Sequence, residues 1–182
     1  MEKGETKTGF TIIEVALTIA IAGLIFLMMF IALPWLRASQ RDAERREDLI
    51  YFINKVKTFQ QKNRGTLPGV DEDSGEVTWS NASAAESPSV ASWAGFYRDY
   101  LGGFFMDPDG ENYRLDIHRC SVGIADADCG AIEENTIFSS DYRIIVVSSA
   151  TCKNNNIVQS SNPRKLAAAY ALETGGIYCV NS

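Results

Sequence analysis

The chain has 182 residues, a net charge of −6 and a single histidine, His118. From Gly65 onward sixteen acidic residues accompany only seven basic ones, so this part lacks the clustered Lys and Arg that nonspecific binding to nucleic acid requires. The sequence shows no Ser-His-Asp grouping, phosphate-binding loop or histidine-based metal set. We therefore expect no enzyme activity, no cofactor, no metal site and no direct binding to nucleic acid.

The residues from Phe10 to Leu33 form an apolar run that is broken only by Thr11, Glu14 and Thr18. Twenty-four helical residues rise about 36 Å, which is enough to cross a bilayer core of about 30 Å. A surface helix of a soluble domain needs a polar face, and this run has none. The sequence therefore predicts a membrane-spanning helix over residues 10–33.

Glu14 is the unusual residue of this run, because a carboxylate inside lipid is costly and marks a functional position. The sequence GFTIIE at residues 9–14 follows a short polar leader, residues 1–9, and resembles the processing and assembly motif of type IV prepilins and pseudopilins. The resemblance implies that a membrane peptidase cuts after Gly9 and N-methylates the new N-terminal residue, Phe10. It also implies that Glu14 guides the docking of subunits during assembly.

The same resemblance implies a location and a set of partners. We expect a single-pass membrane protein whose C-terminal head lies outside the cytoplasm and later becomes part of an extracellular filament. Its partners would be the prepilin peptidase and methyltransferase, the inner-membrane assembly platform, membrane lipid before assembly, and copies of itself and other pilins in a helical filament. The arginines after the span would place the head in the cytoplasm by charge bias alone, but the processing motif requires the leader to lie there.

Several functions remain open at this point. The first is a structural subunit of a type IV pilus that serves adhesion, twitching motility or DNA uptake. The alternative is a minor pilin or pseudopilin of a type II secretion or competence system. A membrane-tethered enzyme or receptor is a third class, and an ordinary signal anchor with a chance glutamate is the simpler explanation of the N-terminal segment.

Residues 34–64 are predicted to continue the helix as an amphipathic stalk. Apolar side chains recur here at helical spacing and predict a face that packs on a sheet: Leu49, Phe52, Ile53, Val56 and Phe59. Gly23 and Pro34 are the predicted sites of a helix kink, because proline lacks the amide hydrogen and clashes with the preceding turn. Gly65 would end the helix in the left-handed conformation.

Residues 65–182 are predicted to form a β-rich head. The fold class is therefore α+β and pilin-like, with a long N-terminal helix packed on an antiparallel sheet. Residues 70–92 are predicted to be a connecting loop, most clearly at 81–89. A short helix, a tight turn and four strands should follow: in chain order they are residues 92–101, 107–113, 113–119, 141–149, 165–172 and 176–180.

Two parts of the head carry further resemblance or ambiguity. The turn at 107–113 resembles the Asp-Pro-x-Gly-x-x-Tyr turn found in pseudopilins of type II secretion and in many Gram-positive-type pilins. Residues 172–179 resemble the terminal hairpin of pilin heads. The alanines of residues 165–172 also favour a helix. We predict a strand there, with a short helix as the alternative.

The four cysteines, Cys120, Cys129, Cys152 and Cys179, are widely spaced and lack the close pairs typical of zinc sites. Disulfides are the better interpretation and agree with a head outside the cytoplasm. Four cysteines allow three connectivities, of which we favour nearest neighbours. The pair Cys152 and Cys179 would resemble the disulfide-bounded C-terminal loop of type IV pilins.

Overall fold

The computed structural model describes residues 9–69, 76–84, 92–119 and 142–182. These residues form one long helix, a five-stranded sheet, a two-stranded sheet and three short helical segments. The chain divides into two compact units, Met1–Ser39 and Gln40–Ser182. The layout of a long apolar N-terminal helix and a β-rich head is α+β, as predicted.

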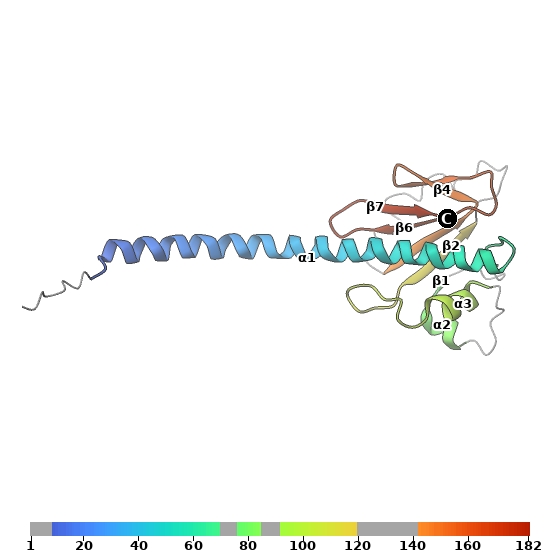
Figure 1. The fold of residues 1–182 in the computed structure, drawn as a ribbon, viewed down its shortest axis with the longest axis horizontal. Helices are drawn as coiled ribbons and strands as arrows, with labels where there is room; N and C mark the ends of the chain where they lie inside the picture. The colour runs from blue at the N-terminus through green and yellow to red at the C-terminus, as the bar shows by residue number, and fades with distance from the viewer. Residues whose placement is uncertain (1–8, 70–75, 85–91, 120–141) are drawn as a thin grey trace, which may run out of the picture. The chain divides into compact units, whose positions relative to one another are not determined.

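The long helix α1 spans Ile12–Lys62 and therefore contributes to both units (Figure 1). It remains helical through Gly23 and Pro34, so the local opening predicted at Pro34 does not occur in this structure. A kink or a stretch on assembly stays a prediction for these two residues. The helix ends as predicted, because Gly65 has a positive φ of 81° and its N–H donates to the Gln60 carbonyl at 2.7 Å.

The main sheet has the strand order β1-β2-β3-β6-β7. In chain order its strands are Glu76–Val77, Arg114–Arg119, Arg143–Ser148, Leu166–Ala171 and Ile177–Asn181. The predicted all-antiparallel sheet is wrong in one place, because β2 and β3 pair in parallel, whereas the other neighbours are antiparallel. A parallel pair needs a crossover of a dozen or more residues, and residues 120–142 between these strands are long enough for one.

A separate hairpin was not predicted. Strands β4 (Ala150–Lys153) and β5 (Asn156–Gln159) pair in antiparallel fashion. The two residues between them, Asn154 and Asn155, both have positive φ, which is the conformation of a type I′ hairpin turn and one that asparagine tolerates. The run of three asparagines at 154–156 was the sequence signal for this turn.

The short helical segments are α2 (Trp79–Ala84), α3 (Trp93–Phe96) and a π-helical turn η1 (Tyr97–Leu101). The last two confirm the helix predicted at 92–101. The loop predicted over residues 70–92 was wrong at two places, because residues 76–77 form β1 and residues 79–84 form α2. Residues 70–75 and 85–91 lie outside the described part. A reciprocal pair of hydrogen bonds between Thr78 and Asn81 caps α2, and the wholly buried Ala82 anchors it on the core.

Two apolar layers cover the two faces of the sheet. On one face lies the second half of α1, whose predicted stripe from Leu49 to Phe59 is buried together with aromatic side chains of α3 and η1. On the other face lies the hairpin β4–β5, packed on residues such as Val147 and Ala167. Strand β6 is therefore buried on both faces and paired on both edges. This environment explains why an alanine-rich segment forms a strand rather than a helix, as predicted.

Candidate assembly site

The junction between Gly9 and Phe10 lies in a segment without regular secondary structure just before α1. Phe10 is 88% exposed. Gly9 has no positive φ among the described backbone angles, and an added Cβ would meet no atom within 4 Å. The fold itself therefore gives no reason for glycine at position 9.

Glu14 lies in the first turn of α1 and is held by Thr11. The Thr11 N–H and hydroxyl both donate to Glu14 Oε2 at 2.9 Å, and the Glu14 N–H donates to Thr11 Oγ1 at 3.4 Å. This reciprocal arrangement is a capping box, which satisfies two of the unpaired N–H groups at a helix start. The sequence analysis assigned Glu14 to assembly and missed this local role, although Thr and Glu three residues apart before an apolar run are its usual signal.

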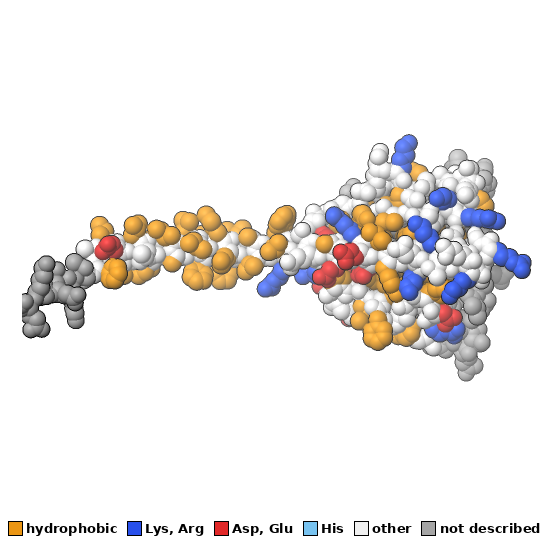
Figure 2. Space-filling model, viewed as in Figure 1, with side chains coloured by type: hydrophobic (Ala, Val, Ile, Leu, Met, Phe, Trp, Pro, Cys, Tyr) orange, Lys and Arg blue, Asp and Glu red, His pale blue; other side chains and the backbone are white. Residues whose placement is uncertain are grey.

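The surface of α1 after this cap is apolar on every side. All large apolar side chains from Phe10 to Leu36 are exposed (Figure 2), and the segment is long and apolar enough to cross a membrane. The hydroxyl of Thr18, the next polar residue, donates a hydrogen bond to the Val15 carbonyl within the helix. A helix that is apolar all round requires lipid or other helices as its surroundings. Gly23 lies in this surface, where an added Cβ would meet nothing within 4 Å.

A second notable group lies in the head unit and centres on Arg45, whose side chain is only 4% exposed. Its Nε and Nη2 donate to the two oxygens of Asp107 at 2.7 and 2.9 Å. Nη2 also donates to Asp109 at 3.1 Å, and Nη1 donates to Glu173 at 2.7 Å and to Asp42 at 3.3 Å. All five N–H groups of one guanidinium are thus used, by four carboxylates from three different segments. We call these five residues the Arg45 cluster.

The carboxylates of the Arg45 cluster have further donors. Asp42 accepts hydrogen bonds from the N–H groups of Glu173 and Thr174 and from the Thr174 hydroxyl. Asp107 also accepts from the Tyr170 hydroxyl at 3.0 Å. Burial alone would raise the pKa of Asp42 and of Asp107, but these donors and Arg45 outweigh burial and lower both pKa values. Both groups are therefore ionised at neutral pH.

Arg41, one turn before Arg45, extends the cluster to its exposed side. Its Nη2 donates to Glu173 at 2.6 Å, and this hydrogen bond is the first of several causes that lower the pKa of Glu173. The cluster therefore holds the turn at 107–110 and the β6–β7 turn against one face of α1. Sequence analysis missed it. The helical spacing that predicted the apolar stripe, continued back from Leu49, reaches Arg45 and Asp42 and would have placed both on the buried face.

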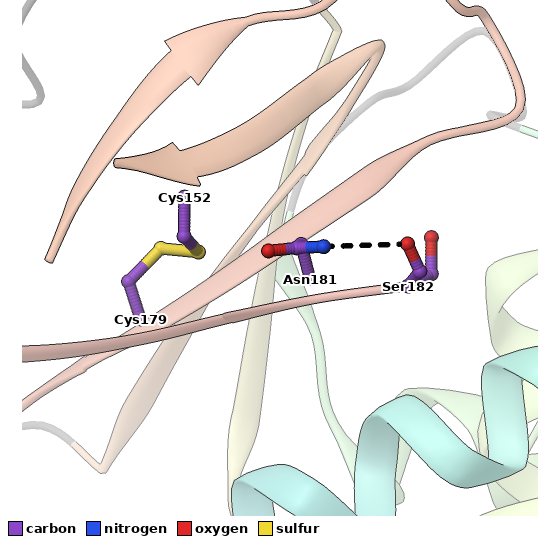
Figure 3. The surroundings of a disulfide bond; sticks show 4 residues. All are labelled: Cys152, Cys179, Asn181 and Ser182. Atoms are coloured by element: carbon purple, nitrogen blue, oxygen red, sulfur yellow. Dashed lines mark hydrogen bonds between the residues drawn. A yellow bond between two sulfur atoms is a disulfide. The ribbon is translucent and has the colours of Figure 1, made fainter. Parts of the chain in front are cut away.

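The cysteines confirm half of the predicted pairing. Cys152 of β4 and Cys179 of β7 form a disulfide across 27 residues (Figure 3). The bond ties the hairpin β4–β5 to the edge strand of the main sheet, and Figure 3 shows it beside the C-terminal residues Asn181 and Ser182. Cys120 and Cys129 lie outside the described residues, so their pairing stays a prediction.

His118 lies on β2 with its side chain exposed, next to Asp116 at 3.1 Å. Within the described ranges, no three His, Cys, Asp or Glu side chains gather as a metal site would require. No family model, curated protein or solved structure matches this chain. The function must therefore be argued from the chain's own geometry.

Proposed function

We propose that this chain is a structural subunit of a type IV pilus, which polymerises through its N-terminal helix into a surface filament. The observation that carries the proposal is the exposed Gly9-Phe10 junction in front of an uncovered apolar helix. A single chain leaves this surface without partners, whereas a membrane and then a filament core would cover it in turn. The same surface would serve both states, because each surrounds the helix with apolar groups.

Two features of the head support this proposal. The Cys152–Cys179 disulfide is of a kind that persists outside the cytoplasm, where the head of a pilin would lie. The second half of α1 is part of the core of the head. One helix thus supplies both the apolar surface for assembly and the scaffold on which the head folds.

The processing step is the direct test. We predict that cells with a prepilin peptidase cut the chain after Gly9 and methylate the amine of Phe10. Filaments sheared from such cells should yield a chain whose intact mass begins at Phe10 with one added methyl group. The matched variant Gly9→Ala, which the open space at this position tolerates, should stay uncut in the membrane. A wild-type chain that still begins at Met1 would contradict the proposal.

The proposed role of the Glu14 charge in assembly can be tested separately from the role of Glu14 in the helix cap. After cleavage the amine of Phe10 would be a charged partner for the carboxylate, either in the same chain or in a neighbouring subunit. Glutamine can replace glutamate in a capping box but carries no charge. We therefore predict that Glu14→Gln and Glu14→Ala are both cleaved and inserted normally and both form few filaments, whereas Thr18→Ala is nearly silent.

The outcome that would contradict this charge role is a normal number of filaments from Glu14→Gln together with few from Glu14→Ala. Thr11→Ala is the complementary control, because it removes the hydroxyl of the cap and keeps the charge of Glu14. If Thr11→Ala lowered the number of filaments as much as Glu14→Ala, Glu14 would act through the helix cap and not through its charge.

The second candidate is a minor pilin or pseudopilin of a secretion or competence system. The turn at 107–113 supports it, since this turn resembles one found in pseudopilins of type II secretion, although many Gram-positive-type pilins share it. Arg45 binds this turn to α1 through Asp107 and Asp109. The number of copies per filament separates the two candidates. Quantitative mass spectrometry of sheared filaments should find this chain as the main component of a pilus, or as a trace component for the second candidate.

A further inference from the structure

A hollow of about 590 Å³ opens on the head where α1 ends. Its lining includes Lys57 from the last turns of α1, Arg64 just after this helix, and Arg164 and Lys165 from the turn before β6. No acidic side chain lines it, and its one carboxylate is that of the last residue of the sequence, Ser182, to which Lys165 donates. We call it the basic hollow.

The shape of the basic hollow is fixed by polar contacts between its walls. The Gln60 side chain donates to the Arg164 carbonyl at 2.8 Å, which holds the turn before β6 against α1. Lys165 donates to the backbone oxygen of Ser182 at 2.8 Å. Arg164 lies against Gly65, with Nη1 3.4 Å from the position that a Cβ would take. The hollow is therefore built by three segments that are distant in the sequence.

Three of its cations have no counterion. The structure gives Lys57, Arg64 and Arg164 no ion pair with any residue that it describes, and Arg64 and Arg164 are exposed. Clustered cations without partners repel one another, so a group of carboxylates or phosphates in the hollow would be favourable. The next question is which anion fits.

The opposite end of the same head carries three exposed acidic side chains, with the exposed Arg46 between two of them. Glu44 and Glu47 lie one turn apart on α1, and Glu111 belongs to the turn that the Arg45 cluster binds to this part of the helix. All three are exposed and have no cation partner among the described residues. Figure 2 shows acidic side chains gathered at this end of the head, close to some basic ones, and further basic side chains spread over the rest of the visible face. About twenty residues of α1 separate the two ends, which is about 30 Å.

We propose that the basic hollow receives the Glu44–Glu47 end of the head of a second copy, in a head-to-tail contact along the filament. The inference rests on the proposed function, since it names a contact within the filament. A contact between two different surfaces of identical chains is heterologous, and such contacts generate open helical assemblies where the rotation between copies does not close a ring. A second copy fits better than a polymer of phosphates, because the chain has a net charge of −6 that repels a polyanion but allows opposite ends to align.

The first experiment reverses charge in the full-length chain in cells that assemble filaments. Lys57→Glu with Arg164→Glu should lower the number of filaments about tenfold or more, because like charges would face each other. Adding Glu44→Lys with Glu47→Lys to the same chain should restore them. Lys153→Glu is the control, since it reverses a charge at an exposed residue that does not line the hollow.

The second experiment identifies the occupant without assuming it. A photo-crosslinking amino acid at Gln61, which lines the hollow, is activated in cells that have been shifted from light-isotope to heavy-isotope medium, so that both kinds of copy are present. The expected product is a peptide containing residues 44–47 or 111, joined between a heavy and a light copy. Adducts to nucleic acid, to another protein or only within one chain would overturn the proposed contact.

The two proposals fail in different ways. If the wild type forms filaments and the charge-reversed variant assembles equally well, the head-to-tail contact is wrong and the filament function stands. If the wild type forms no filaments, the filament function is wrong. In that case, photo-crosslinking from Gln61 in membranes containing the chain would be the test of whether the heads of two copies are in contact.

Discussion

Replacing Arg45 by methionine should be among the most damaging single substitutions in the head. Methionine keeps most of the aliphatic length and removes the charge and all five donors. Asp107 would lose its bidentate partner while its side chain stays fully buried, and Asp42 would keep only its hydrogen bonds from the β6–β7 turn. Arg41 would still bind Glu173. The loss of the charge and hydrogen bonds of Arg45 would therefore affect mainly Asp42 and Asp107.

The expected loss follows from the cost of an unpaired buried charge. Removing one partner of a buried ion pair costs about 3–5 kcal/mol. For a unit of the size of Gln40–Ser182, this corresponds to a decrease of roughly 10–17 °C in the unfolding temperature. Arg41→Met is the matched control, because it removes the same type of side chain one turn earlier. Its effect should be far smaller, since Arg41 is about a third exposed, at 35%, and water screens its pairs.

Unfolding of the full chain in detergent, followed by the fluorescence of the buried Trp93, measures both variants. The pH dependence adds a second criterion. The pKa values of Asp42, Asp107 and Glu173 are lowered in the fold, so their stabilisation is present above their ordinary pKa of about 4 and is lost as the pH falls through the lowered values. The gap between wild type and Arg45→Met should therefore shrink in acid. Equal losses from Arg41→Met and Arg45→Met at neutral pH would refute this reasoning.

Two further substitutions test the head. Burial, and to a lesser degree neighbouring acidic residues, raise the pKa of Asp48, although a hydrogen bond from Tyr113 lowers it. The contribution of Asp48 to stability is therefore lost as the pH rises. Asp48→Asn can still accept the bond from Tyr113 and should raise the unfolding temperature at neutral pH by about 1–3 °C. A decrease would show that the charge itself is needed. Replacing Cys152 and Cys179 by alanine should lower the free energy of unfolding by roughly 3–4 kcal/mol, measured by urea titration, whereas a loss below about 1 kcal/mol would mean that the reduced chain already keeps this loop closed.

The sequence was sufficient to predict an element and its buried face wherever the short-range pattern and the tertiary environment favour the same structure. The apolar stripe from Leu49 to Phe59 predicted the buried face of α1, and alternation predicted β2. Pattern was insufficient for the parallel pairing of β2 and β3, because a local pattern does not tell in which direction two distant strands run relative to each other. It was also insufficient for the Arg45 cluster, because three of the four acceptors come from turns that lie more than sixty residues away from Arg45.

The Arg45 cluster raises the question of why a buried ionic group lies where apolar side chains would pack as well. An apolar contact between α1 and two turns would tolerate a shift by one helical turn, because leucine-sized groups recur along the stripe. The guanidinium does not tolerate such a shift, since its five donors meet four carboxylates in one arrangement, and a displaced turn would leave buried charges unpaired. We infer that the cluster fixes the register of the 107–110 and β6–β7 turns on α1. That register holds the turn before Glu111 on the part of α1 that carries Glu44 and Glu47. The proposed contact of this end of the head with the basic hollow of a second copy therefore depends on Arg45.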